Sequence, residues 1–165
     1  MNKFINITTS ALFLSLLIFV SCGGGNDEPD APIDPCAINS EILVSGVATI
    51  SKVTNPSGTI VTDEWTGFTL DFSGTKDGGS FTTNVSTLND TSLENIWSAS
   101  GSWIFDAADA NCKTLTINGG FAAGTRNVAI SAITASGINL SFNVPETDTG
   151  RTQGIPGTWI FEFSY

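Results

Sequence analysis

The sequence contains no histidine, and this absence removes several kinds of chemistry at once. Histidine is the commonest general base, the central member of most catalytic triads and the usual nitrogen ligand of zinc. The chain also lacks a Gly-x-Ser-x-Gly elbow, a phosphate-binding P-loop and a dinucleotide-binding glycine fingerprint. We therefore expect a protein that is not an enzyme, with no catalytic residue, no cofactor and no metal site.

Basic side chains are also scarce. The chain has 6 lysines and arginines against 16 aspartates and glutamates, for a formal net charge of −10. Proteins that bind nucleic acid neutralise its phosphates with clustered Lys and Arg, so this balance argues against a nucleic-acid partner. It equally disfavours electrostatic adhesion to anionic lipid headgroups. An acidic excess of this size keeps a secreted surface soluble.

No apolar run has the roughly 20 residues that a membrane-spanning helix needs. The main apolar run, ALFLSLLIFV at residues 11–20, follows a short N-terminal segment that carries Lys3. A positive N-terminus followed by a short apolar core is typical of a secretory signal peptide. We predict that residues 1–21 are a signal peptide, and an uncleaved membrane anchor is the alternative.

The residues at the end of this segment, Phe19-Val20-Ser21-Cys22, resemble the lipobox that the lipoprotein signal peptidase recognises. The resemblance implies cleavage before Cys22 and attachment of acyl chains to that cysteine. Each buried CH₂ of an acyl chain contributes about 0.8 kcal/mol, so several chains hold a domain on a membrane without any protein span. Lipid attachment at Cys22 is thus the first site that the sequence predicts.

The segment after Cys22 has the composition of a flexible spacer. Residues 23–30 read GGGNDEPD, and we predict an acidic Gly/Pro tether over residues 22–36. Glycines beside the cysteine, followed by an acidic run, also resemble the tether of Bacteroidetes-type outer-membrane lipoproteins. That resemblance implies a protein anchored by lipid to the outer membrane, on the cell surface or on the periplasmic face.

Only two cysteines remain once Cys22 carries lipid. These are Cys36 and Cys112. An exported protein enters an oxidising compartment, where a pair of cysteines forms a disulfide more often than a nucleophile or a metal site. We predict a disulfide between Cys36 and Cys112.

Residues 37–165 form one domain, because about 130 residues are enough to bury a core of their own. Short runs in which apolar and polar residues alternate are separated by turn residues, which predicts antiparallel strands. The expected runs are residues 42–53, 59–62, 68–73, 81–86, 103–105, 114–117, 128–134, 138–142 and 159–165. Their short connections predict an all-β antiparallel meander of about eight strands. Pairing the last strand with the first would close a β-barrel, and an open β-sandwich is the alternative.

This succession of short strands, together with the signal peptide and the tether, resembles the small lipocalin-like β-domains of Bacteroidetes-type lipoproteins. Lipocalins carry a Gly-x-Trp pattern on their first strand, whereas here it occurs late, in GSWIFD at residues 101–106 and GTWIFE at residues 157–162. We interpret these two segments as strands in similar environments, and an internal duplication is the alternative. The resemblance is to an architecture and implies no particular ligand. The aromatic run 159–165 also resembles the closing strand of outer-membrane barrels, so a membrane-spanning barrel is a further alternative.

The four tryptophans are the main candidates for binding. Trp103 and Trp159 lie in regular alternation, so we expect them in the core. Trp65 and Trp97 lie beside irregular segments, and we predict that they contact a ligand at the barrel mouth. The leading hypothesis is a non-enzymatic cell-envelope lipoprotein that binds a small apolar or glycan ligand there. The alternative is a structural or protein-interaction module with a packed core.

Acidic residues supply two weaker alternatives. Two carboxylates about 5 to 10 Å apart are the machinery of glycoside hydrolases. Asp106, Asp109 and Asn111, and separately Glu146 and Asp148, form oxygen clusters of the kind that bind calcium. Most of these side chains lie in predicted turns, where they cap backbone amides, and this is the simpler explanation.

Overall fold

The computed structural model describes residues 32–88, 90–121, 124–146 and 156–165. From Ile33 onward these residues belong to one compact unit. Its elements are α1 (Pro35–Leu43), β1 (Ala48–Thr54), η1 (Thr62–Trp65), β2 (Thr69–Thr75), β3 (Gly78–Thr83), η2 (Val85–Thr87), η3 (Thr91–Asn95), β4 (Ser100–Phe105), β5 (Thr114–Phe121), β6 (Gly124–Thr134), β7 (Gly137–Val144) and β8 (Gly157–Ser164). The elements marked η are 3-10 helices.

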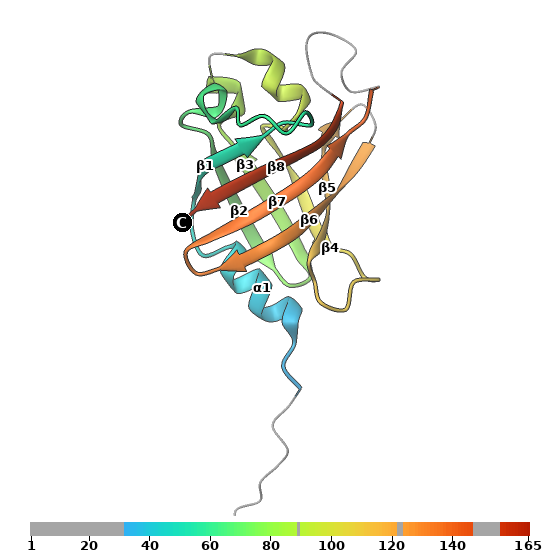
Figure 1. Ribbon diagram of the computed structural model, residues 1–165. Helices are drawn as coiled ribbons and strands as arrows, with labels where there is room; N and C mark the ends of the chain where they lie inside the picture. Colours follow the sequence, from blue (N-terminus) through green and yellow to red (C-terminus); the bar gives the residue numbers. More distant parts are fainter. Residues whose placement is uncertain (1–31, 89, 122–123, 147–155) are drawn as a thin grey trace, which may run out of the picture. The chain divides into compact units, whose positions relative to one another are not determined.

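The eight described strands form a closed antiparallel barrel in the order of the sequence (Figure 1). Each strand pairs with the next, and β8 pairs with β1 over a register that includes Val53 opposite Phe161. The predicted meander and its closure into a barrel are confirmed, and the open sandwich is wrong. Closure removes the two free edges that a sandwich sheet would expose.

Alternating side chains make the inner and outer surfaces of this barrel. In β8 the side chains of Trp159, Phe161 and Phe163 are buried while Thr158 and Ile160 are exposed. Most other strands follow the same period of two, because successive side chains of a strand point to opposite faces of the sheet. Register shifts in β1, β5 and β6 interrupt it locally. The inner faces meet in a single apolar core that fills the barrel with aromatic rings.

The pairing is least extensive where β1 meets β2. Only Ala48 opposite Leu70 and Thr49 opposite Thr69 are in register there. Farther along β1, the chain that follows the turn at Asn55 pairs with β1 instead of β2. The amide of Asn55 donates to the carbonyl of Thr59 at 2.9 Å. The predicted strand at residues 59–62 is therefore wrong, since this segment forms one isolated bridge and then enters η1.

Helix α1 was not expected from the sequence, and it shortens both the predicted tether and the predicted first strand. It occupies residue 42, so the first strand begins at Ala48. It also begins inside the segment predicted as tether. Asp34 explains its start: the Asp34 side chain accepts hydrogen bonds from the amides of Cys36 at 2.9 Å and Ala37 at 3.4 Å, and Pro35 is favoured in the first turn.

The predicted signal peptide at residues 1–21, Cys22 and the tether up to residue 31 lie outside the described residues. Most of the predicted loop at residues 146–154 lies outside them as well, including Asp148. No helix within the described part of the chain is long and apolar enough to cross a membrane.

Candidate functional site

The end of the barrel away from α1 is covered by the three 3-10 helices, and we call this end the mouth (Figure 1). Trp65 is the last residue of η1 and is fully buried. Its ring makes edge-on contacts with Phe68, at 5.1 Å between centroids, and with Phe161, at 4.9 Å. The indole of Trp65 thus closes the mouth from within the core.

Trp97 closes the mouth from the other side. It follows η3, is 1 % exposed, and packs edge-on against Phe142 at 4.9 Å and Phe161 at 5.3 Å. Both tryptophans therefore contact Phe161. We call the two segments that carry them, η1 and the segment from η3 to Trp97, the cap. Aromatic pairs in this geometry add about 0.5 to 1.5 kcal/mol each to the free energy gained by burial.

A buried arginine holds the segment that carries Trp97. Arg126 points inward from β6, where its guanidinium lies 3.8 Å from the ring centroid of Phe121. It donates to the carbonyl of Asn95 at 3.0 Å and also to the carbonyl of Ile96. These carbonyls lie at the end of η3, so Arg126 caps that helix and fixes the backbone just before Trp97.

Trp65 and Trp97, which we predicted to contact a ligand, are as buried as the two core tryptophans. The irregular segments beside them fold inward as 3-10 helices instead of projecting as loops. The core positions predicted for Trp103 and Trp159 are confirmed. Contact between a ligand and Trp65 or Trp97 therefore requires that the cap move.

The four indoles differ in their hydrogen bonding. Nε1 of Trp103 lies 3.1 Å from the carbonyl oxygens of both Ser73 and Ser80, to which it donates. Nε1 of Trp65 and Nε1 of Trp97 are buried and have no acceptor among the described residues. A buried donor without an acceptor costs about 1 to 3 kcal/mol, so these two N–H groups are the least satisfied polar groups in the cap.

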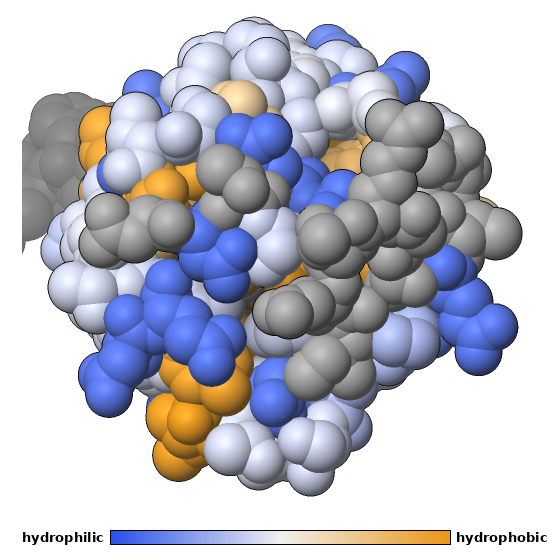
Figure 2. Space-filling model, turned by 90° about the horizontal axis from the view of Figure 1, so that it is seen from above, coloured by the Kyte–Doolittle hydropathy of each residue, from blue (hydrophilic) through white to orange (hydrophobic). Residues whose placement is uncertain are grey.

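The surface of the mouth is largely polar (Figure 2). Two hollows lie in this surface. One, of about 260 Å³, is lined by Glu94, Asn95, Ser98, Gly119, Gly120, Phe121 and Arg126. The other, of about 270 Å³, is lined by Asp63, Glu64, Thr66, Thr87, Leu88 and Asp90. Hydrogen bonds from Ser92 hold the pKa of Asp90 below its ordinary value, so that carboxylate is committed to the start of η3.

The acidic side chains in the turns accept hydrogen bonds from backbone amides. Asp109 accepts hydrogen bonds from the amides of Asn111 at 3.0 Å and Lys113 at 2.8 Å, and these bonds lower its pKa. Asp106 accepts from the amide of Ala108 at 2.9 Å. No group of three metal-ligating side chains of the His, Cys, Asp or Glu type occurs among the described residues. The carboxylates of this loop therefore act as turn caps.

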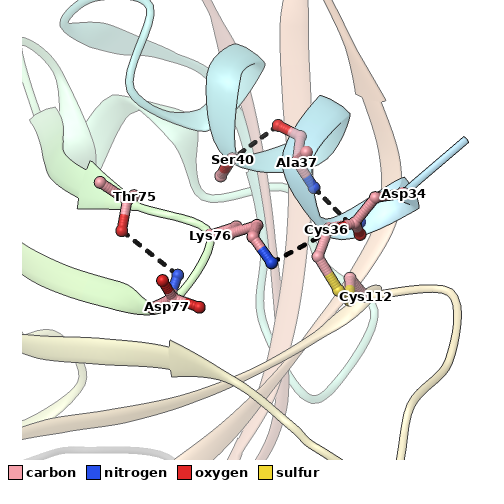
Figure 3. Close-up of polar contacts among 8 residues, drawn as sticks. All are labelled: Asp34, Cys36, Ala37, Ser40, Thr75, Lys76, Asp77 and Cys112. Carbon is pink, nitrogen blue, oxygen red and sulfur yellow. Dashed lines mark hydrogen bonds and ion pairs between the residues drawn. A yellow bond between two sulfur atoms is a disulfide. The ribbon is translucent and has the colours of Figure 1, made fainter. Parts of the chain in front are cut away.

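The opposite end, which we call the base, is organised around α1 and the predicted disulfide. Cys36 and Cys112 are bonded, with their Cα atoms 5.1 Å apart, so this prediction is confirmed (Figure 3). The side-chain amide of Asn39 adds hydrogen bonds to the carbonyls of Asn111 at 3.2 Å and Cys112 at 3.1 Å. The helix is thus attached to the β4–β5 connection by covalent and polar contacts.

A salt bridge ties the same helix to the β2–β3 turn. Nζ of Lys76 lies 3.3 Å from a carboxylate oxygen of Asp34 (Figure 3). Partial desolvation opposes ionisation of Asp34, but the hydrogen bonds from Lys76 and from the amides of Cys36 and Ala37 outweigh it and lower its pKa. Both partners are about half exposed, so the salt bridge orients the turn and stabilises it little.

The outer wall of the barrel carries almost no charge over more than half of its circumference. Strands β3 to β7 contain one ionisable side chain, Arg126, and it points inward. Their outward side chains are mostly Ser, Thr and Asn. On the remaining wall, Lys52 of β1 forms a 2.8 Å salt bridge with Glu162 of β8. No aromatic side chain among the described residues is exposed, so the wall has no stacking platform for a sugar.

Comparisons with protein-family models and with curated proteins give no match to this chain. The site is therefore defined by its geometry: an interior rich in packed aromatic rings, a mouth capped by Trp65 and Trp97, a base closed by α1, and a wall that carries no outward charge over β3 to β7.

Proposed function

We propose that the chain is a non-enzymatic, exported lipoprotein whose barrel serves as a packed structural or interaction module at the cell envelope. The observation that carries the proposal is the filled interior. Aromatic rings from the strands and from the segments at the mouth occupy the barrel, and four hollows lined by described residues lie at its two ends. In this proposal a partner contacts the outer surface of the barrel and not its interior.

Export and lipid attachment rest on two further observations. The apolar run at residues 11–20 leads directly to Ser21 and Cys22. The disulfide between Cys36 and Cys112 fits a protein that matures in an oxidising compartment. The leader and the disulfide thus support the same route out of the cytoplasm, with the outer membrane as the proposed destination.

The test is intact-mass analysis of the protein extracted from membrane fractions. We expect a mass that corresponds to residues 22–165 plus acyl chains, and we expect the Cys22→Ser variant to be found in the soluble fraction. A protein that keeps residues 1–21, or a Cys22→Ser variant that stays bound to membranes, would contradict the proposal.

A second function, binding of a small ligand at the mouth, is favoured by one observation. The two indole N–H groups of Trp65 and Trp97 lack acceptors among the described residues. An apolar molecule with an acceptor at one end, or a glycan hydroxyl, would satisfy them once the cap opened. The Nε1–H signals of the four tryptophans in a ¹⁵N-correlated NMR spectrum test this directly. Fatty acids or oligosaccharides that shift only the Trp65 and Trp97 signals would establish the ligand function. Unchanged signals would contradict ligand binding and favour the packed module.

A further inference from the structure

Exposed large apolar side chains are unevenly distributed between the two ends of the barrel. Within the described residues they are Ile33, Ile38, Val47, Ile60, Ile104 and Ile160. Four of them belong to the base. Ile33 precedes α1 and is 79 % exposed, Ile38 lies on its outer side, and Val47 leads from α1 into β1. Ile104 stands on β4 next to the connection that holds Cys112.

A groove at the base is lined by one of these side chains, Ile104. It has a volume of about 320 Å³ and lies between the start of α1 and the β4–β5 connection. Ile104, Phe105, Ala107 and Ala110 give it an apolar wall, and the Cys36–Cys112 disulfide closes one side. The disulfide and the bonds of Asn39 hold the two sides together, so this surface is preformed.

We propose that the base rests on a lipid surface, with Ile33, Ile38 and Ile104 inserted among the headgroups. The inference rests on the proposed lipid attachment at Cys22, because the anchor decides which end of the barrel meets the membrane. The chain enters the described unit at Ile33, directly before α1, so the end that carries the exposed isoleucines is the end to which the anchor connects.

Chain length makes this contact effective even though each side chain contributes little. Ten residues lie between Cys22 and Ile33 in the sequence, which limits the distance between these two residues to about 40 Å. A short tether converts a weak bimolecular contact into an intramolecular one with an effective concentration of the order of millimolar. Apolar side chains that reach about 5 to 10 Å into the headgroup region then favour one orientation of the barrel.

The charges of the base determine which lipids suit it. Glu41, Asp77, Asp106 and Asp109 stand at this end, Lys113 beside Cys112 carries the opposite charge, and the carboxylate of Asp34 is partly offset by Lys76. Acidic side chains are repelled by the negative surface potential of anionic lipids. The base therefore fits a zwitterionic lipid surface, and anionic lipid weakens the contact.

Hydrogen–deuterium exchange of the acylated protein tests the proposal. The protein, with its acyl mass verified, is placed in phosphatidylcholine vesicles and compared with the soluble Cys22→Ser variant. We expect amide exchange in residues 33–47 and 104–112 to slow by roughly tenfold on the vesicles, while exchange in residues 60–66 at the mouth stays unchanged. Replacing a third of the lipid with phosphatidylglycerol should reduce this protection.

Two matched acylated variants complete the test. Ile33→Ser/Ile38→Ser/Ile104→Ser should lose the vesicle protection, and Ile60→Ser/Ile160→Ser, which changes exposed isoleucines outside the base, should keep it. Acylated protein without protection at the base, or equal protection at the mouth, would overturn the inference while leaving lipid attachment intact. Protection that depends on protein concentration in the absence of vesicles would also overturn it, in favour of a second copy of the chain. Absence of the acyl mass would instead overturn the proposed function.

Discussion

At the scale of single residues, the most informative side chains are those that the barrel turns inward. Trp65 and Trp97 belong to irregular segments, yet they are as buried as Trp103 in regular alternation. Arg126 points to the same, inner face of β6 as Val128 and Ile130 and is buried with them. Because a buried arginine is rare without hydrogen-bonded partners, its position in an apolar alternation marks a structural role.

Truncation of the cap tryptophans tests this burial. We expect Trp65→Ala and Trp97→Ala each to lower the free energy of unfolding by about 3 to 5 kcal/mol, as Trp103→Ala does, because each leaves a large cavity. Phenylalanine variants separate the ring from its N–H group. Trp103→Phe should cost about 1 kcal/mol more than Trp65→Phe, since Nε1 of Trp103 donates to two carbonyls and Nε1 of Trp65 has no acceptor among the described residues. Denaturant unfolding measures both, and a loss below about 1 kcal/mol for Trp65→Ala would place that ring at the surface.

The phenolate absorbance of this protein reports on Tyr165 alone, because the chain has a single tyrosine. Its hydroxyl donates to the carbonyl of Leu43 at 3.4 Å, and burial raises its pKa to about 12. A raised pKa means that the folded protein favours the neutral phenol, so this stabilisation is complete below pH 10 and is lost as the pH rises towards 12. We expect phenolate absorbance to appear near pH 12 in the native protein and near pH 10 in denaturant. A native midpoint at 10 would show that Tyr165 is exposed.

At the scale of elements, the strands follow from the sequence and the helices do not. Alternation such as Phe68, Leu70 and Phe72 against polar neighbours is a direct consequence of the pleat, so most strands are predicted to within a few residues. Helix α1 has nine residues and no charged first turn, and an Asp-Pro pair is its main local signal. The segment at residues 59–62 has strand composition but lacks a neighbour to continue its pairing, which depends on distant parts of the chain.

Close packing between strands explains a glycine on β4. A Cβ atom at Gly101 would lie 2.7 Å from Cε1 of Phe81 and would also strike the carbonyl of Asn118. We expect Gly101→Ala to destabilise the protein by about 1 to 3 kcal/mol, because backbone and ring cannot both move away. Gly46→Ala is the control, since nothing lies within 4 Å of its Cβ position. Thermal unfolding of the two variants measures the difference, and equal melting temperatures would contradict the tight packing of β3, β4 and β5.

At the scale of the whole molecule, the disulfide and the barrel closure connect distant parts of the chain. Cys36 and Cys112 are 76 residues apart in the sequence, and β1 pairs with β8. Alternation predicted the barrel, and the export signal predicted the oxidised cysteines. Whether the interior is hollow or solid depends on how far the mouth segments fold inward, and composition does not encode that distance.

The disulfide should contribute to global stability as well as to the position of α1. On the chain-entropy view, closing a loop of this length contributes about 4 to 5 kcal/mol, less any strain in the native state. We expect Cys36→Ser/Cys112→Ser to unfold at lower denaturant concentration, with the β-barrel signal in circular dichroism retained before the transition. An unchanged midpoint would show that α1 is held by Asn39 and the salt bridge of Asp34 alone.

The packed interior distinguishes the proposed module from a ligand-binding barrel, and one titration tests it directly. The soluble Cys22→Ser protein is titrated with N-phenyl-1-naphthylamine, a neutral probe whose fluorescence rises in apolar cavities. We expect no saturable rise in probe emission under native conditions, because the rings around Phe161 leave the probe no space. Saturable binding of one probe per barrel, with quenching of tryptophan emission, would contradict the packed module and establish a ligand-binding lumen.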